Sequence, residues 1–162
     1  MRYRASIITV SDKGSAGQRE DKSGPALREL LVTDYDVSDI TVIPDEIPVI
    51  AETIRLEVDE KGMDLVVTTG GTGVTQRDVT PEATRMVIER ELPGFAEVMR
   101  AGSYKITPNA IISRAVCGIR KESIIINLPG SPKAATECLH FVLEAIPHAL
   151  SKLKGDPSDC AV

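Results

Sequence analysis

A glycine-rich turn, Gly70-Gly71-Thr72-Gly73, follows a run of apolar residues and stands shortly before a predicted helix. Glycine lets the backbone come close to a ligand, and successive backbone amides can form a concave binding site for an anion. The Lys-Ser/Thr pair of a P-loop and the spacing of a GxGxxG dinucleotide fingerprint are both missing here. The residues therefore predict either an anion-binding turn of another kind or a purely structural turn between a strand and a loop.

Two aspartates near predicted strand ends are candidate ligands for a divalent cation. Asp78 follows the glycine-rich turn, and Mg²⁺ at phosphate-binding sites typically takes one or two carboxylates together with phosphate oxygens. The neighbouring Arg77 can face a phosphate or pair with Asp78 or Glu82. Asp45 follows another predicted strand and can face the same cleft by topology, although its local sequence is explained better by a Pro-Asp turn.

Three further segments combine turn or capping signals with possible binding roles. Thr80 is predicted to cap the helix that begins with Pro81, since threonine suits the N-cap and proline the first helical position. Ser131 has the same relation to Pro132, and the free amides and positive dipole of such a helix start can also hold a phosphate. Ser11-Asp12 ends the first predicted strand, where it can hydrogen-bond a polar heterocycle or form a simple turn.

Alternating strands and helices must position these residues. Apolar runs bounded by turn residues predict strands at 3–10, 37–43, 65–69, 115–119 and 123–128. Apolar residues at helical spacing predict helices near 26–31, 48–61, 80–90 and 93–103, and a long final helix that Pro147 kinks or splits. The stretch from 11 to 22 is predicted to be a loop.

This order of elements predicts the fold class α/β, as a three-layer α/β/α sandwich around a mostly parallel sheet. The tight link at 120–122 predicts a short antiparallel hairpin at one edge. Ligands of such sheets bind beyond the carboxyl ends of the strands, and the loops richest in Gly, Ser, Thr and Asp leave those ends. We expect one domain over residues 1–154, with a binding site at that edge, followed by a polar tail at 155–162.

Composition narrows the function classes. The 162 residues carry 19 Lys and Arg against 24 Asp and Glu, a net charge of −5, and only 3% are aromatic, with no Trp. General nucleic-acid binding is therefore not expected, since it needs a basic surface and aromatic side chains for stacking. Cys117, Cys138 and Cys160 form no CxxC pair, which suits a reducing cytosol. No signal peptide or membrane-spanning segment is evident, so we expect a cytoplasmic protein without membrane contact.

Two long segments resemble a known family. The segments TTGGTGVTQRDVTPEAT at 68–84 and INLPGSPKAA at 126–135 resemble the MogA/MoaB family of molybdenum cofactor biosynthesis proteins, whose relatives include the gephyrin G domain. Shorter matches occur in the same order at Ser11-Asp12, Ile43-Pro44-Asp45-Glu46, Pro93-Gly94-Phe95 and Ile112-Ser113-Arg114. The resemblance covers the chain from Tyr3 to about Leu153.

The resemblance implies a homotrimer and a molybdopterin adenylyltransferase, which converts Mg-ATP and molybdopterin into adenylyl-molybdopterin and pyrophosphate. Asp45 and Asp78 match the two catalytic acids of the family, and we expect them to hold Mg²⁺. Segments that contact the nucleotide are matched by Gly70, Gly71, Thr72, Gly73, Pro129, Gly130 and Ser131. Ser11 and Asp12 match a loop that lines the same cleft. Molybdenum insertion is expected to need a separate protein, because no second domain is fused to the chain.

Two other functions remain open at this point. MoaB-like members share the motifs, so the chain can instead be a non-catalytic trimeric module that binds molybdopterin or serves as a scaffold. A nucleotidyltransferase that uses the same cleft with another acceptor is the second alternative. Asp45, Asp78 and the compact loop at 128–133 favour the catalytic branch.

Overall fold

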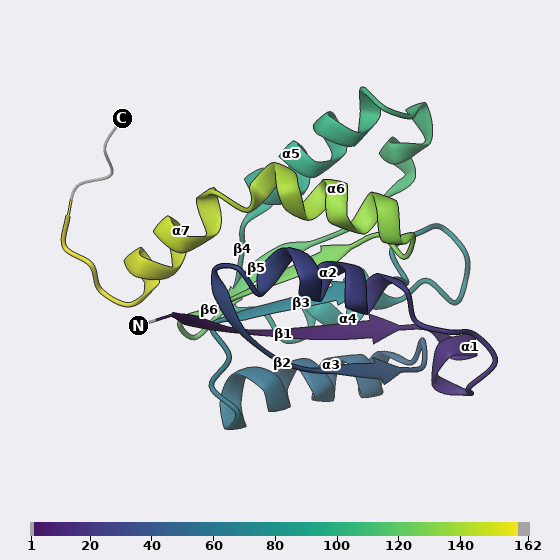
Figure 1. Cartoon of the computed structure of the whole chain (residues 1–162), viewed down its shortest axis with the longest axis horizontal. Coiled ribbons are helices and arrows are strands. Elements are labelled where there is room, and N and C mark those ends of the chain that lie inside the picture. Colours follow the sequence, from purple (N-terminus) through teal and green to yellow (C-terminus); the bar gives the residue numbers. More distant parts are fainter. Residues whose placement is uncertain (1, 159–162) are drawn as a thin grey trace.

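A single sheet of six strands organises residues 2–158, the part of the chain that this computed structural model describes (Figure 1). The strands are β1 (Tyr3–Val10), β2 (Tyr35–Ile43), β3 (Leu65–Thr69), β4 (Arg90–Glu91), β5 (Cys117–Arg120) and β6 (Ser123–Leu128). In the order β2-β1-β3-β6-β5-β4, the first four strands run parallel, while β5 and β4 pair antiparallel at one edge. The predicted sheet is confirmed.

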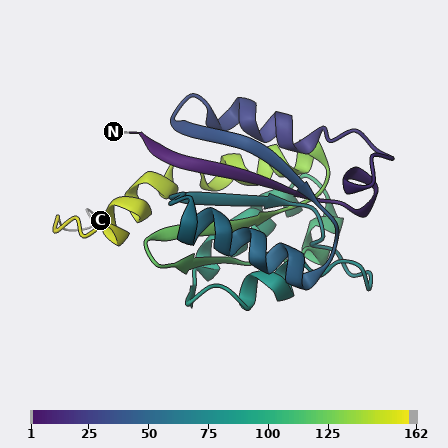
Figure 2. The ribbon, with the colours of Figure 1, turned by 90° about the horizontal axis from the view of Figure 1, so that it is seen from below.

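Helices cover both faces of this sheet (Figure 2). The α-helices are α1 (Asp12–Ser15), α2 (Ser23–Leu31), α3 (Ile47–Arg55), α4 (Thr80–Arg85), α5 (Pro93–Tyr104), α6 (Pro132–Val142) and α7 (Ala145–Leu153). A π-helical turn, η1 (Leu56–Glu60), continues α3, and a 3₁₀ helix, η2 (Pro108–Ile112), follows α5. Helices α2, α5, α6 and α7 pack on one face, and α3, η1 and α4 pack on the other, which confirms the three layers.

The central strands are buried on both faces, which explains their nearly continuous apolar sequence. Along β1, Ala5 and Ile7 belong to the core under α2, α5 and α6, whereas Ile8 and Val10 belong to the core under α3 and α4. All six residues of β6 are buried. Such strands are typical of parallel sheets that are covered by helices on both sides.

Three short elements, α1, η2 and β4, were not predicted. Helix α1 lies inside the predicted loop, where the Ser11 hydroxyl accepts a hydrogen bond from the Gly14 amide at 3.0 Å. Helix α4 ends at Arg85, so the predicted extent to residue 90 is wrong. The chain turns there because the amides of Glu89 and Leu92 donate to carbonyls of β5, which makes the two-residue β4 an edge strand.

The predicted final helix is divided into α6 and α7 at residues 143–144, ahead of Pro147. Pro147 is the third residue of α7, where its missing amide costs no intrahelical hydrogen bond. Residues 155–158 follow this helix, and the rest of the predicted tail, including Cys160, lies outside the described residues. No helix within 2–158 is long and apolar enough to cross a membrane.

The core of β6 supplies a stability test. Ile126 is fully buried between the two helical layers, and Ile126→Ala is expected to lower the free energy of unfolding by about 2–5 kcal/mol, through lost burial and a residual cavity. Val74→Ala, at a side chain that is 69% exposed, should change it by less than about 0.5 kcal/mol. Urea unfolding of both variants measures the difference, and equal effects would contradict this assignment of the core.

Candidate active site

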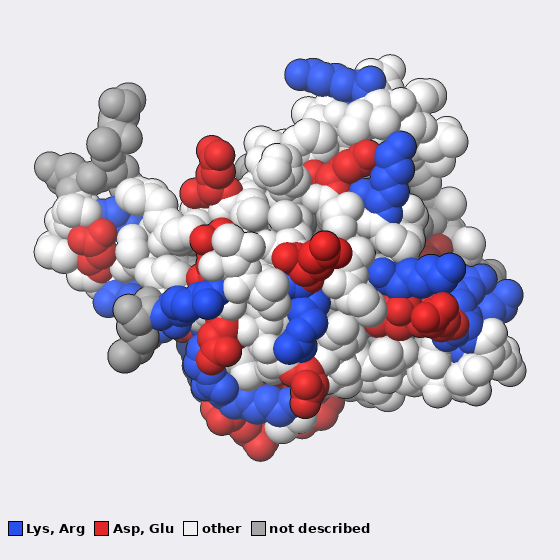
Figure 3. All heavy atoms as spheres, in the orientation of Figure 1, with Lys and Arg blue, Asp and Glu red and all other residues white. Residues whose placement is uncertain are grey.

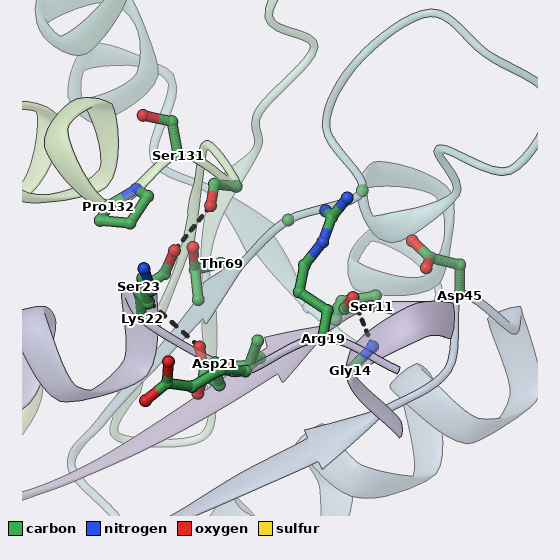
Figure 4. A pocket seen from close by; sticks show the side chains of 16 residues that line it. Ser11, Gly14, Arg19, Asp21, Lys22, Ser23, Asp45, Thr69, Ser131 and Pro132 are labelled. Carbon is green, nitrogen blue, oxygen red and sulfur yellow. Dashed lines mark hydrogen bonds between the residues drawn. The ribbon is translucent and has the colours of Figure 1, made fainter. Parts of the chain in front are cut away.

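Loops that follow the four parallel strands meet at the carboxyl edge of the sheet and enclose a cavity of about 770 Å³ (Figure 4). Of the predicted site residues, this cavity is lined by Ser11, Asp45, Gly70, Gly71, Gly130 and Ser131. Residues from distant parts of the chain are thus brought together at the edge where the topology placed the site.

A second cavity of about 470 Å³ lies against the same loops. Of the predicted residues, it is lined by Gly71, Thr72, Gly73, Asp78, Pro129 and Gly130. Its remaining wall comes mainly from α5 and the segment around η2, with Met99 and Asn109 among the lining residues. Because Gly71 and Gly130 line both cavities, ligands bound in the two cavities can meet at these glycines.

The glycine-rich turn is shaped by two residues with positive φ, Gly70 at +102° and Gly71 at +68°. A Cβ at Gly70 would lie 2.3 Å from the Val10 carbonyl oxygen, and a Cβ at Gly71 would lie 2.3 Å from the Thr80 hydroxyl. The Gly70 amide donates to the Leu128 carbonyl at 3.0 Å. Within residues 2–158, the amides at 71–73 donate to no protein group and are therefore available to a ligand, and the anion-binding role of the turn stays a prediction.

One of the two predicted helix caps is wrong. Thr80 is the first residue of α4 and does not cap it, because its hydroxyl donates to the Gly70 carbonyl at 2.9 Å and its amide donates to the Gly71 carbonyl at 3.1 Å. Thr80 therefore supports the turn instead of the helix. The Ser131 hydroxyl accepts a hydrogen bond from the Ala134 amide at 3.4 Å, which confirms the cap of α6.

Asp45 and Asp12 are linked by two reciprocal hydrogen bonds. The Asp12 amide donates to Oδ2 of Asp45 at 2.8 Å, and the Asp45 amide donates to Oδ1 of Asp12 at 3.0 Å. Burial raises the pKa of Asp45, an effect that the Asp12 amide opposes, whereas a hydrogen bond from Arg77 lowers the pKa of Asp12. Asp12 lines neither cavity. Its carboxylate instead accepts hydrogen bonds from the Asp45 amide and the Arg77 guanidinium.

Asp78 is held by its own loop and by Arg114, a residue that local sequence did not place. The Thr75 amide donates to Oδ2 of Asp78 at 2.8 Å. The Arg114 guanidinium donates to the carbonyls of Asp78, at 2.6 Å, and Gly73, at 2.7 Å, and it pairs with Glu82. This pairing lowers the pKa of Glu82 and raises that of Arg114. Glu82 thus anchors the arginine that shapes the loop.

The loop before α2 also lines the first cavity, which sequence analysis missed. In the view of Figure 4, Arg19 extends between Asp45 on one side and Ser23 on the other. Asp21 accepts hydrogen bonds from the Thr9 hydroxyl at 2.8 Å and from the amides of Ser23 and Gly24 at 3.1 and 3.0 Å. The short spacing from Asp21 to the helix start is a capping pattern that could have located this segment.

A buried amide side chain connects the sheet to the loops of the second cavity. Asn127 is fully buried, and its Nδ2 donates to the hydroxyls of Thr68 at 3.0 Å and Thr84 at 2.9 Å. Its Oδ1 accepts a hydrogen bond from the Val116 amide at 3.1 Å. This network fixes β6 relative to β3, α4 and the start of β5, because a buried amide without partners would be costly.

The two predicted metal ligands suit a cation that shares its coordination with a substrate. Within residues 2–158, no three His, Cys, Asp or Glu side chains are arranged to hold an ion. Asp45 and Asp78 each use Oδ2 for a backbone amide, and Oδ1 of each accepts no hydrogen bond from the described residues. Mg²⁺ bound by one or two carboxylates takes its other ligands from phosphate oxygens and water. The metal role of both residues stays a prediction.

Residues 6–148 match the family described as "Probable molybdopterin binding domain", and the chain belongs to this family. A molybdopterin adenylyltransferase from Helicobacter pylori strain J99 is 45% identical over 154 residues, covering 93% of this chain and 87% of the relative. The molybdopterin adenylyltransferase of Escherichia coli K12 is 41% identical over 168 residues, covering 94% and 86%. The predicted relationship to the MogA/MoaB family is confirmed.

Solved structures show the same fold. The molybdopterin biosynthesis enzyme MoaB from Thermus thermophilus is 48% identical, with a TM-score of 0.90 over 97% of this chain and 99% of that one. The tungsten cofactor synthesizing protein MoaB from Pyrococcus furiosus is 36% identical, with a TM-score of 0.87 over 94% and 98%.

The short distance between Gly71 and the Thr80 hydroxyl leaves no room for a methyl group at position 71. Gly71→Ala is expected to lower the free energy of unfolding by about 1–3 kcal/mol, because the new Cβ overlaps the Thr80 hydroxyl and the backbone has a positive φ. Gly94→Ala is the matched control, since a Cβ at Gly94 meets nothing within 4 Å and alanine favours the helix. Thermal unfolding of both variants measures the two changes in stability. A Gly71→Ala variant as stable as the wild type would contradict the tight packing of the turn.

Proposed function

We propose that this protein is a molybdopterin adenylyltransferase, which transfers AMP from ATP to molybdopterin and releases pyrophosphate. The observation that carries this proposal is the pair of cavities that share Gly71 and Gly130. Asp45 lines one cavity and Asp78 the other, so both carboxylates can act near a phosphate at the junction. The names and identities of the relatives from H. pylori and E. coli support the same reaction.

The proposed transfer joins two anionic groups. The phosphate monoester of molybdopterin attacks the α-phosphorus of ATP, a new P–O bond forms, and the bond from the α-phosphorus to the β-bridging oxygen breaks. Pyrophosphate leaves with that oxygen. Since the attacking monoester is already ionised, the protein must supply alignment and positive charge rather than a strong base. Among the described residues, no histidine lines either cavity.

Backbone groups of this chain are suited to stabilise the phosphates. The unpaired amides at 71–73 and the amino end of α6, after Pro129-Gly130-Ser131, are the donors that we expect to bind phosphate oxygens. Asp45 and Asp78 would hold Mg²⁺, which neutralises charge on the triphosphate when it is bound. Ser11 and Ser131 line the cavity where they can hydrogen-bond a polar substrate.

A homotrimer and a hand-over of the product are further parts of the proposal. Large apolar side chains are exposed at the end of α5 and around η2, namely Tyr104, Ile106, Ile111 and Ile112. A cluster of this kind is typical of a surface that another subunit covers. We expect the adenylylated product to pass to a separate molybdenum-insertion protein, since the reaction itself inserts no metal.

Substitution of the two acids tests the proposed reaction. Purified protein with Mg-ATP and molybdopterin should release pyrophosphate and form an adenylylated pterin, detected by mass spectrometry. Asp78→Asn and Asp45→Asn should each lower kcat by about 100-fold or more, because removal of a charge that stabilises the transition state costs this much. Asp36→Asn, an exposed aspartate near the opposite end of β2, is the control and should retain wild-type turnover.

The possible outcomes separate the candidate functions. Molybdopterin binding without any adenylylated product from the wild type would overturn the proposal and leave the non-catalytic binding or scaffold module. An ATP-dependent product with another acceptor would indicate a different nucleotidyltransferase.

Light scattering tests the assembly. The wild type should have a mass three times that of the 17.4 kDa chain, and Ile111→Glu should shift it toward the monomer, because a buried carboxylate disfavours the interface. Val32→Glu changes an exposed valine in the turn after α2 and should leave the mass unchanged. A monomeric wild type would exclude the trimer.

A further inference from the structure

One exposed guanidinium, that of Arg77, connects the loops that follow the first three strands. On the face drawn in Figure 3, basic and acidic side chains are interspersed. Arg77 lies in the loop after β3, and its Nε and Nη2 donate to Oδ2 and Oδ1 of Asp12 at 3.0 and 2.9 Å. The same Nη2 donates to Oε1 of Glu46 at 2.8 Å. Asp12 follows β1 and Glu46 follows β2, so a single side chain spans three segments of the site.

The contact continues from Asp12 to Asp45. The backbone amide of each aspartate donates to the carboxylate of the other, so an Asp12 side chain that is fixed by Arg77 also fixes the backbone of Asp45. This arrangement holds Oδ2 of Asp45 and leaves Oδ1 beside Gly71, where a Cβ would lie 3.1 Å from it. Arg77 is therefore linked to Asp45 through Asp12 without touching it.

Arg77 is also adjacent in sequence to Asp78, whose carbonyl is held on the other side by Arg114. The loop that carries Asp78 is thus anchored at two points, to Arg114 and, through Arg77, to the loops of Asp12 and Glu46. We propose that Arg77 is a positioning residue, which sets the placement of Asp45 relative to Asp78 for the adenylyl transfer. This inference rests on the proposed function.

The ion pairs of Arg77 are exposed to solvent, so we expect Arg77 to affect the geometry of the site more than the stability of the fold. The side chains of Arg77, Asp12 and Glu46 are 55%, 43% and 50% exposed, and ion pairs this exposed contribute little to stability. Four carboxylates, those of Asp12, Asp45, Glu46 and Asp78, nevertheless gather at this edge. Loss of the arginine would leave Asp12 and Glu46 without their shared cation and would remove the paired hydrogen bonds that orient the Asp12 carboxylate toward the Asp45 amide.

Arg77→Gln removes the charge and the paired hydrogen bonds. It should lower kcat by about 10- to 100-fold, as expected for a displacement of reacting groups by about 1 Å, and change the KM for ATP by less than about threefold. Arg77→Lys keeps the charge and should recover part of kcat. Arg85→Gln is the matched control, because Arg85 pairs with Glu91 at similar exposure, 53% and 50%, outside both cavities, and should behave as the wild type.

Amide hydrogen exchange gives a second readout that needs no turnover. In Arg77→Gln, the amides of Asp12 and Asp45 should exchange at least about 10-fold faster by NMR, because both donate within the linked pair. Arg85→Gln should leave these two rates unchanged. Arg77→Gln combined with Asp12→Asn should lose no more kcat than the more affected single variant, because both changes break one linkage.

Two results would contradict the positioning role of Arg77. Unchanged exchange at both amides in Arg77→Gln would overturn it, and so would a large rise in the KM for ATP at constant kcat, which would indicate direct substrate binding. A wild type that shows no adenylyl transfer would refute the proposed function and with it any effect of Arg77 on that reaction. The exchange rates would then still decide whether Arg77 positions Asp45.

Discussion

The backbone at Gly70 and Gly71 packs so closely against its neighbours that a side chain at either position would overlap the Val10 carbonyl or the Thr80 hydroxyl. This packing brings the end of β3 against the end of β1 and the start of α4. It also leaves the amides at 71–73 without protein partners among the described residues. Both cavities contain Gly71, so the junction between them depends on this turn.

The loops around the turn are held by polar contacts rather than by the apolar core. Arg77 joins three of them through Asp12 and Glu46, and Arg114 fixes the carbonyls on either side of the loop at 73–78. Such contacts are directional, so they fix the placement of a carboxylate more closely than apolar packing does. The sheet places the loops at its carboxyl edge, and the contacts of Arg77 and Arg114 then orient these loops relative to one another.

Buried strands were predicted to within two residues at each end, since a strand covered on both faces is apolar along its whole length. The elements that were missed, α1, η2 and β4, contain four, five and two residues, too few to show a period. Helix α4 was predicted too long because the pairing of Glu89 and Leu92 with β5 is invisible in the local pattern.

Sequence alone determined the longer strands and helices, the glycine-rich turn, the family and the candidate acids Asp45 and Asp78. Only the tertiary structure decided that the Asp12 carboxylate binds Arg77 and the Asp45 amide, and that Arg114 holds the loop of Asp78. These partners are separated by at least 33 positions along the chain. Periodicity and capping signals act over a few residues, whereas the choice of a distant hydrogen-bond partner depends on how the packed sheet brings the loops together.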